Sequence, residues 1–415
     1  MRIGIDISQI VYGTGVSNYT RLLVENLVKV DRKNQYILFG ASLRQFAKLK
    51  QFKEEVADYP NVEFKLLHLP LALLNFLWNR LHVFPIERFI GEVDVFHSSD
   101  WVQPPVKSSV TKKVTTVHDL IVYLFPSSLH PKIVSTQKRR LALVKKEADS
   151  IIADSQTTKE DLVKFLEIPQ EKITVVYLAP SPEFKPKDDD KIAQVLEKYK
   201  IKKPYILSVA TQEPRKNIQT LLDAFGEITK TRTNVILVLT GKYGWGPGLR
   251  VSGNIRRPQS ATASVRLKSQ SDSGGDFGGQ VIWTGYVSQD DLITLYSGCR
   301  VFVYPSLYEG FGLPILEAMA AGSPVVTSNN SSMVEVAKDV AILVDPRSQG
   351  QIKKAIELVL DLNLENYQKM VRASLDRARQ FSSTKTARET LKVYEELVRN
   401  NENPQVSTQT TPGVK

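Results

Sequence analysis

PSLYEGFGLPILEAMAAGSPVV, residues 305–326, is the stretch that decides the fold. It begins where one apolar strand, RVFVYP (300–305), ends, and it runs into a second apolar strand, SPVVTS (323–328). Between the two strands, a glycine-rich turn leads into a helical pattern over 314–321, and Pro314 suits the first helical position. A strand, a helix and a further strand in this order are typical of a parallel sheet.

The same alternation extends along nearly the whole chain. The predicted strands of the first half are 2–7, 35–40, 62–67, 93–98, 113–119, 149–153 and 173–177, and its predicted helices lie at 16–30, 137–147 and 155–167. The second half has predicted strands at 204–210, 234–241, 280–285, 300–305, 323–328 and 340–345, with helices near 217–229, 289–297, 314–321, 348–361, 364–380 and 383–399. The pattern therefore predicts an α/β protein with two doubly wound sheets.

A proline-rich and charged segment, LAPSPEFKPKDDDK (178–191), separates the halves and is interpreted as a linker. We expect two Rossmann-like domains, residues 1–180 and 181–380, that face each other across a cleft, because open α/β sheets bind ligands at the carboxyl ends of their strands. The segment 246–279 and the tail 401–415 are polar and aperiodic, and both are expected to be disordered.

The turn within 305–326 also has chemistry that suits a nucleotide sugar. Backbone N–H groups and the start of a helix together form an anion site fit for a diphosphate. Glu309 lies in the turn and Glu317 lies in the helix, and a carboxylate can accept paired hydrogen bonds from the hydroxyls of a sugar or a ribose. The alternative is a glycine turn with a surface glutamate and a capped helix.

Two cations lie in a second loop, within ATQEPRKNIQTLL (210–222). Arg215 and Lys216 come between a predicted strand and a predicted helix, where they can neutralise a leaving diphosphate. The alternative is a pair of solvated loop cations.

Further candidates follow predicted strands of both halves. In the first half, His118 ends the strand in TTVHDL (115–120), and Gly15 lies in a loop, YGTGVSNYTRLL (12–23), where glycine allows close approach to a ligand. A structural histidine is the alternative for His118. The remaining candidates are Tyr286, which follows a strand of the second half, and His97 and Asp100, which are equally compatible with an acceptor site and with a structural role.

These segments resemble the retaining glycosyltransferase family 4, which has the GT-B fold, and the resemblance covers the chain apart from 246–279 and the tail. Glu309 and Glu317 match the family's E-x7-E signature, which implies that Glu309 contacts the transferred hexose and Glu317 the ribose. The backbone at Phe311, Gly312 and Leu313 would then cradle the sugar and the β-phosphate.

The resemblance also assigns roles to the other segments. His118 would lie near the hydroxymethyl group of the donor sugar, and its neutral imidazole would form a hydrogen bond to the sugar. Gly15 would lie near the phosphates, and Tyr286 would lie near the base. Lys216 matches the lysine that binds the diphosphate. The family has a further arginine where this chain has Thr211, so Arg215 is the substitute. The family's last helix, here 383–399, packs back on the first domain.

The composition restricts the partners. The net charge of +11 favours an anionic partner, and since no nucleic-acid module is found, a phosphorylated ligand or an anionic membrane surface is expected. The chain shows neither a signal peptide nor an apolar run long enough to span a membrane, which predicts a cytoplasmic protein, with peripheral attachment to the inner face of the membrane as an option. Cys299 is interpreted as a small core residue.

No metal site is predicted from the sequence. The five histidines lack ligand spacing, and Asp188–Asp190 is interpreted as a solvated charge run among lysines. We expect no cofactor beyond the donor, because lysine, arginine and backbone amides would bind its diphosphate.

Two segments of the first half are candidates for acceptor or membrane contact. LPLALLNFLWNRLHVFPIERFIG (69–91) is apolar with scattered arginines, and KIVSTQKRRLALVKK (132–146) is basic without an acid. Together they suit an anionic bilayer or a lipid-linked acceptor, whereas a core helix beside a solvated basic helix explains them equally well.

The sequence therefore predicts a retaining, metal-independent hexosyltransferase that acts on a hydroxyl of a glycan or lipid-linked acceptor. The loop sequence EPRKN (213–217) favours GDP-mannose as donor, with a UDP-hexose as the other option. The alternatives are a GT-B epimerase or phosphorylase and a non-catalytic protein that binds sugar nucleotides. The oligomeric state is left open.

Overall fold

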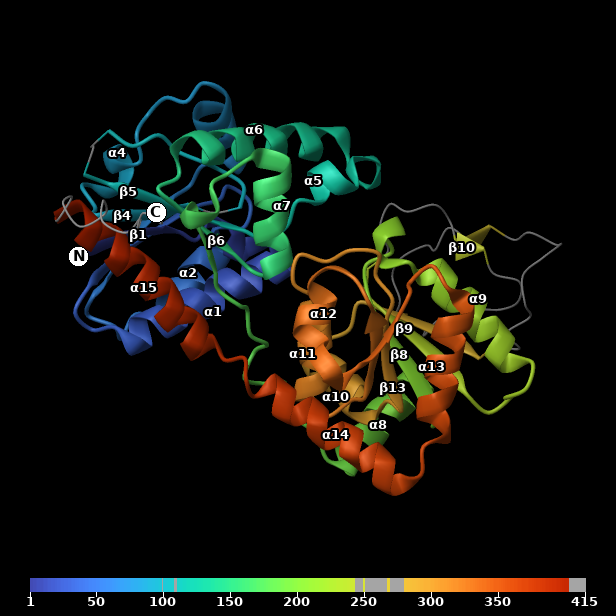
Figure 1. Ribbon diagram of the computed structural model, residues 1–415. Helices are drawn as coiled ribbons and strands as arrows, with labels where there is room; N and C mark the ends of the chain where they lie inside the picture. Colours follow the sequence, from blue (N-terminus) through green and yellow to red (C-terminus); the bar gives the residue numbers. More distant parts are fainter. Residues whose placement is uncertain (99, 108–109, 243–248, 251–266, 269–279, 403–415) are drawn as a thin grey trace, which may run out of the picture. The chain divides into compact units, whose positions relative to one another are not determined.

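The chain divides into two compact α/β units (Figure 1). The computed structural model describes residues 1–402 apart from 99, 108–109, 243–248, 251–266 and 269–279. The first unit comprises Met1–Leu178 and the chain from Ser383 onward, and the second comprises Ala179–Ser382.

The first unit is built on a seven-stranded parallel sheet with the order β3-β2-β1-β4-β5-β6-β7. Its strands are β1 Arg2–Asp6, β2 Gln35–Ala41, β3 Val62–Leu67, β4 Val95–Ser98, β5 Lys112–Val117, β6 Ser150–Ala153 and β7 Ile173–Val175. The strand order reverses between β1 and β4, where Ile5 pairs with His97. The carboxyl ends of these central strands are therefore the edge at which a ligand site is expected.

Helices cover this sheet on both faces. They are α1 Gly15–Val30, α2 Phe46–Glu55, α3 Leu71–Leu74, α4 Glu87–Ile90, α5 Ile121–Leu124, α6 Pro131–Glu147, α7 Gln156–Leu166 and α15 Ser383–Glu402. Single turns η1 Ser8–Tyr12, η3 Pro126–Ser128 and η4 Gln170–Lys172 are 3-10 helical, and η2 Asn75–Arg80 is a π-helical turn. Helix α15 packs along α1, with Ala387 and Tyr394 fully buried (Figure 1).

The segment 69–91 is divided between core and surface. Because side chains alternate along a strand, Ile37, Phe39 and Ala41 of β2 share one face, and Leu74 and Trp78 pack in the same cluster. The single core helix, one of the two interpretations of this segment, is not formed, since the segment folds as α3, η2 and α4.

The second unit has a six-stranded parallel sheet with the order β12-β9-β8-β13-β14-β15. Its strands are β8 Tyr205–Val209, β9 Ile236–Thr240, β12 Val281–Gly285, β13 Val301–Tyr304, β14 Val325–Ser328 and β15 Ile342–Val344. Its helices are α8 Asp189–Tyr199, α9 Ile218–Thr229, α10 Gln289–Gly298, α11 Leu313–Ala320, α12 Ser331–Ala337, α13 Gln349–Asp361 and α14 Leu364–Ala378, with 3-10 turns η5 Pro214–Lys216 and η6 Lys338–Val340. The strand order reverses between β8 and β13, so the loops after these two strands meet at one edge.

The linker prediction for 178–191 is wrong at its end, because helix α8 begins inside it. Asp188 caps this helix by accepting a hydrogen bond from the backbone of Lys191 at 2.8 Å, and Asp189 and Asp190 occupy the first turn. The aspartates therefore stabilise a helix start, where negative charge is favourable. The spacing of the buried Ile192, Val195, Leu196 and Tyr199 was the helical signal that the prediction missed.

Most of the aperiodic segment 246–279 lies outside the described residues. Within it, β10 Leu249–Arg250 and β11 Leu267–Lys268 form a short parallel pair. Helix α15 ends at Glu402, and the rest of the tail 401–415, which was predicted to be disordered, lies outside the described residues.

Candidate active site

In the second unit, the loops after β8 and β13 are joined by hydrogen bonds. The backbone of Leu307 donates to the carbonyl of Arg215 at 2.8 Å, and the Ser306 hydroxyl donates to the same carbonyl at 3.1 Å. Asn217 adopts a left-handed conformation, with φ of 56°, and its amide donates to the carbonyls of Pro305 at 3.0 Å and Pro346 at 2.6 Å. The loop that contains the two predicted cations is therefore fixed against the glycine-rich turn.

Glu309 lies at the centre of this cluster, and its side chain is buried. Oε1 accepts hydrogen bonds from Lys216 Nζ at 2.8 Å, from the Tyr304 hydroxyl at 2.9 Å and from Ser306 Oγ at 2.5 Å. Oε2 lies 2.8 Å from Arg215 Nη1. The structure thus brings together three residues predicted from two separate segments and adds Tyr304 and Ser306.

The charges of this cluster are strongly coupled. Burial alone raises the pKa of Glu309, but the charges of Arg215 and Lys216, with hydrogen bonds from Lys216 and Ser306, lower it to about 2. Burial, and to a smaller extent the charge of Arg215, lowers the pKa of Lys216, while Glu309 opposes the shift. A second carboxylate, Glu213 Oε2, lies 3.3 Å from Arg215 Nη2, so two carboxylates balance the two cations in the absence of a ligand.

Helix α11 begins directly after the glycine-rich turn. It starts at Leu313, one residue before the predicted position, and Gly312 precedes it with a φ of 88°. This left-handed conformation favours glycine. Phe311 is buried, whereas Leu313 is partly exposed at the helix start.

Glu317 lies in the second turn of α11 and is partly buried. The hydroxyl of Tyr296, on α10, donates to its Oε2 at 3.2 Å. Burial raises the pKa of Glu317 to about 7, against a smaller opposing effect of this hydrogen bond. Tyr296 was not predicted, because its position on another helix gives it no sequence relation to Glu317.

Tyr286 is the most exposed of the candidate residues. It follows Gly285 at the end of β12, and 74% of its surface is accessible. The Nζ of Lys242 lies 5.3 Å from the centre of its ring. An exposed ring at the carboxyl edge of the sheet is suited to stacking on a flat ligand.

In the first unit, His118 forms a buried pair with Asp154. Its Nδ1 lies 2.5 Å from Asp154 Oδ2, and the ring of Tyr19 meets the imidazole edge-to-face at 4.9 Å between centroids. Burial lowers the pKa of His118, but the charge and hydrogen bond of Asp154, with Asp100 and Asp119, raise it to about 9. This pairing favours the imidazolium, whereas the sequence led us to expect a neutral imidazole.

The loop before α1 is open around its glycines. Gly13 has a φ of 62°, and Thr14 caps α1 in a capping box with Ser17. A Cβ atom added to Gly13 or Gly15 would meet nothing within 4 Å, so the fold itself provides no steric reason for glycine at position 15.

His97 and Asp100 have structural partners. His97 is buried, with Nδ1 2.6 Å from the Tyr394 hydroxyl and Nε2 2.9 Å from Thr116 Oγ1. The carboxylate of Asp100 lies 3.2 Å from Arg140, a fully buried residue of α6. Of the two interpretations of His97, these contacts favour the structural one.

The described residues contain neither a candidate metal centre nor a membrane-spanning helix. Within them, no group of three or more histidine, cysteine or carboxylate side chains could hold a metal ion. Likewise, no helix in the described part of the chain is both long and apolar enough to cross a membrane.

Two doubly wound units with parallel sheets define the GT-B class of glycosyltransferases. A solved glycosyltransferase from Rickettsia africae has this fold, with a TM-score of 0.67 and 17% identity over 96% of this chain and 99% of that chain. Residues 13–183 match the model described as Glycosyltransferase Family 4, and residues 188–377 match Glycosyl transferases group 1.

The chain belongs to the group 1 glycosyltransferases, and it is an enzyme that transfers sugars. The O-antigen chain mannosyltransferase B of Escherichia coli is 31% identical over 307 residues, which cover 73% of this chain and 74% of that protein. The serotype-specific mannosyltransferase WbdA of Escherichia coli is 29% identical over 77% of this chain, but the match covers 37% of WbdA.

Proposed function

We propose that the enzyme transfers mannose from GDP-mannose, with retention of anomeric configuration, to a hydroxyl of a lipid-linked glycan. The observation that carries the proposal is the cluster in which Glu309 holds Arg215 and Lys216 side by side, at 2.8 Å from each.

The two cations bind and stabilise the diphosphate of the donor. Breaking the bond between the sugar and the β-phosphate places negative charge on the leaving group, and fixed cations stabilise that charge without reorganisation. Glu309 compensates the burial of both cations before the donor arrives. Glu317 accepts hydrogen bonds from the ribose hydroxyls, and Tyr286 stacks on the base.

Glu309 is a poor nucleophile and a poor base in this environment. Three donors contact its Oε1 and Arg215 contacts its Oε2, and its pKa is about 2, so it has little affinity for a proton. We therefore assign it to positioning of the hexose and the cations. The departing diphosphate then accepts the proton of the acceptor hydroxyl on the face where the new bond forms, which retains the configuration.

His118 supplies a cationic hydrogen-bond donor. Because Nδ1 is paired with Asp154, Nε2 of the imidazolium is the atom available to an oxygen of the transferred sugar. Asp154 is a positioning residue that fixes the orientation of the ring and keeps it protonated.

Mannose is the proposed sugar because the names of both bacterial relatives describe mannosyltransferases. The loop at 213–217 is compatible with the same donor. The lipid-linked acceptor is supported by the apolar and cationic side chains of segments 69–91 and 132–146, and it would bring the enzyme to a membrane surface.

Metal independence follows from the same cluster. Since Arg215 and Lys216 supply the charge that a divalent ion would provide, EDTA should leave the transfer rate unchanged. Complete loss of activity with EDTA, restored by Mg²⁺ or Mn²⁺, would contradict this part of the proposal.

A binding screen tests the donor. Calorimetric titration with GDP-mannose, UDP-glucose and UDP-N-acetylglucosamine should give the tightest binding for GDP-mannose. Preferred binding of a UDP-sugar would overturn the choice of sugar but leave the site intact. Conversion of the donor to an epimer, or binding without transfer to any acceptor, would support the epimerase or the non-catalytic alternative.

A further inference from the structure

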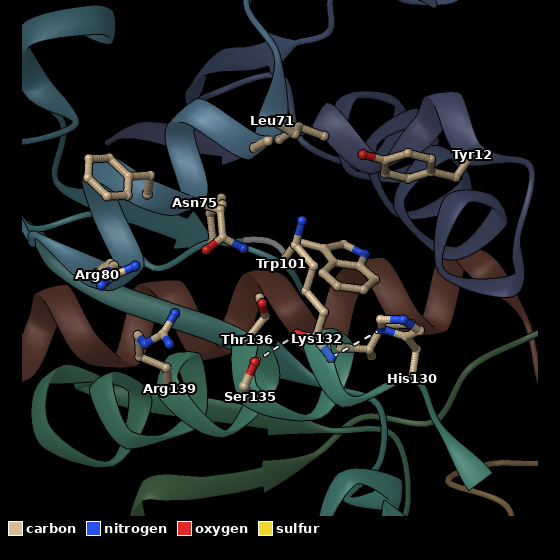
Figure 2. Close-up of a pocket in the computed structure, with 14 residues that line it drawn as sticks. Tyr12, Leu71, Asn75, Arg80, Trp101, His130, Lys132, Ser135, Thr136 and Arg139 are labelled. Carbon is tan, nitrogen blue, oxygen red and sulfur yellow. Dashed lines mark hydrogen bonds between the residues drawn. The ribbon is translucent and has the colours of Figure 1, made fainter.

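A cavity of about 680 Å³ lies in the first unit, apart from the cluster around His118 (Figure 2). One wall comes from α3 and η2, with Asn75 and Phe76, and another comes from the first turns of α6, with Lys132 and Thr136. Trp101, which follows β4, lies between the two walls (Figure 2). The volume is in the range of small-molecule sites in proteins.

The cavity is lined by cations without a neighbouring acid. Arg80, Lys132 and Arg139 line it, and its lining contains no aspartate or glutamate. Within the described residues, none of these three cations forms an ion pair, although Arg140 and Lys145 of the same helix pair with Asp100 and Glu167. The cavity lining therefore carries unbalanced positive charge, which favours an anionic ligand.

The helix start at the cavity adds to this preference. His130 caps α6, and the N–H groups of Lys132, Ile133 and Val134 bond to its ring or carbonyl. The first-turn amides are therefore occupied, and the helix contributes only its positive end. Direct contacts to an anion must come from the three cationic side chains.

The other face of the cavity is apolar and exposed. Phe76 and Tyr12 line it with 44% and 43% of their surfaces accessible, and Leu71 and Trp101 also line it. Further along the chain from Phe76, Leu81 and Phe84 are exposed at 50% and 43%. Exposed apolar side chains that line a cationic cavity suit a ligand with a charged head and a hydrocarbon chain.

We propose that this cavity binds the phosphate-linked end of a lipid-linked acceptor, and the assignment rests on the proposed function. The phosphate group lies among Arg80, Lys132 and Arg139. The first sugar meets Trp101 and the polar side chains of Asn75 and Thr136, and the aliphatic chain follows Phe76 towards Leu81 and Phe84. The cavity thereby selects acceptors that carry both a phosphate and a hydrocarbon chain.

Direct binding tests the inference without any transfer reaction. The probes are decyl phosphate below its micelle concentration, inorganic phosphate, and decyl glucoside as a neutral amphiphile, each titrated calorimetrically into the full chain. Decyl phosphate should bind, and the other two should bind at least tenfold more weakly, because each supplies only one of the two contacts. Equal binding of inorganic phosphate or of decyl glucoside would overturn the inference.

Variants assign the binding to the cavity. Lys132→Ala combined with Arg139→Ala should weaken the binding of decyl phosphate by about 100-fold or more, because the double variant removes two charge-assisted contacts. Lys145→Ala removes an exposed cation of the same helix that does not line the cavity, so it should leave binding unchanged. If Lys145→Ala weakens binding as much as the double variant, the contact is unspecific attraction to the basic helix, and the assignment is wrong.

The donor gives an independent readout. GDP-mannose affinity should be the same in the double variant and the wild type, while the KM for a lipid diphosphate acceptor rises. Retained GDP-mannose binding without decyl phosphate binding would reject the cavity assignment and leave the proposed function standing. Failure of the wild type to bind GDP-mannose would instead reject the proposed donor.

Discussion

Arg215 and Glu309 form a buried ion pair, with Nη1 2.8 Å from Oε2, and Lys216 holds the other carboxylate oxygen at the same distance. The proposed donor site therefore also stabilises the fold of the second unit. Removing the Glu309 carboxylate takes the ion-pair partner from buried Lys216 and leaves Arg215 with Glu213 alone. Removing one cation leaves the other to neutralise Glu309. Variants of Glu309 therefore test the stability of the second unit, whereas a variant of one cation tests the transfer reaction.

Glu309→Ala should lower the free energy of unfolding by about 3–5 kcal/mol, because a buried charge loses its partner. Urea unfolding followed by circular dichroism measures this change. Glu227→Ala is a suitable control, since Glu227 pairs with Lys230 on the exposed surface and should cause little change. Equal stability of Glu309→Ala and the wild type would contradict the structural role of the carboxylate.

Acid should weaken the cluster in a defined pH range. The pKa of Glu309 falls from its ordinary value of 4.5 to about 2, so its ionisation stabilises the folded state above pH 4.5. This contribution is lost as the pH falls from about 4.5 to 2. The stability difference between wild type and Glu309→Gln should therefore shrink over that range, and a difference that stays constant would contradict the prediction.

Asp154→Asn should change the pH dependence of transfer. The pKa of His118 is about 9 because Asp154 outweighs the effect of burial. If the imidazolium is the active form, wild-type transfer declines above about pH 9, and the variant declines from about pH 6.5 or below. A pH–rate profile at saturating donor measures the shift, and coincident profiles would exclude a role for the protonated ring.

Glu317 should make nucleotide binding pH-dependent. Its pKa is about 7 in the ligand-free protein, and only the ionised carboxylate accepts hydrogen bonds from both ribose hydroxyls. GDP should therefore bind more weakly at pH 5.5 than at pH 8. Glu317→Gln should remove most of this dependence, and an unchanged dependence in the variant would assign it to another group.

Tyr394→Phe should destabilise the attachment of α15 to the first unit. The hydroxyl lies 2.6 Å from Nδ1 of buried His97, and an unsatisfied buried polar atom costs about 1–3 kcal/mol.

Burial lowers the pKa of His97 to about 3, so the ring is neutral when folded. Stability should thus decline as the pH falls from 6.5 towards 3, when the unfolded chain takes up a proton. Thermal unfolding of both proteins measures these effects.

The fold could be predicted from the sequence because apolar strands and glycine-rich turns are local signals. All thirteen strands predicted for the two main sheets are present, with ends that shift by up to two residues. Helix α8 was missed because the acidic run at Asp188–Asp190 was interpreted as a solvated charge run, not as a helix cap.

The candidate site could be predicted only in part. Residues that follow strands, such as Glu309 and His118, are visible in the sequence, because parallel strands end at one edge. Tyr304, on β13, precedes Glu309 by five residues. Tyr296, the partner of Glu317, and Asp154, the partner of His118, come from other parts of the chain, and only folding brings these pairs together. No sequence pattern indicates the acidic partner of His118, since Asp154 is 36 residues away.

The most direct test of the central claim is the rate of mannose transfer from GDP-mannose to a lipid diphosphate acceptor in Lys216→Ala. This variant keeps Arg215 as the partner of Glu309, so the second unit should remain folded, and Lys230→Ala serves as a surface control in the same unit. The account predicts a decrease of about 100-fold or more in kcat for Lys216→Ala and wild-type transfer for the control. Wild-type kcat in a folded Lys216→Ala protein would contradict the claim that this cluster stabilises the leaving diphosphate.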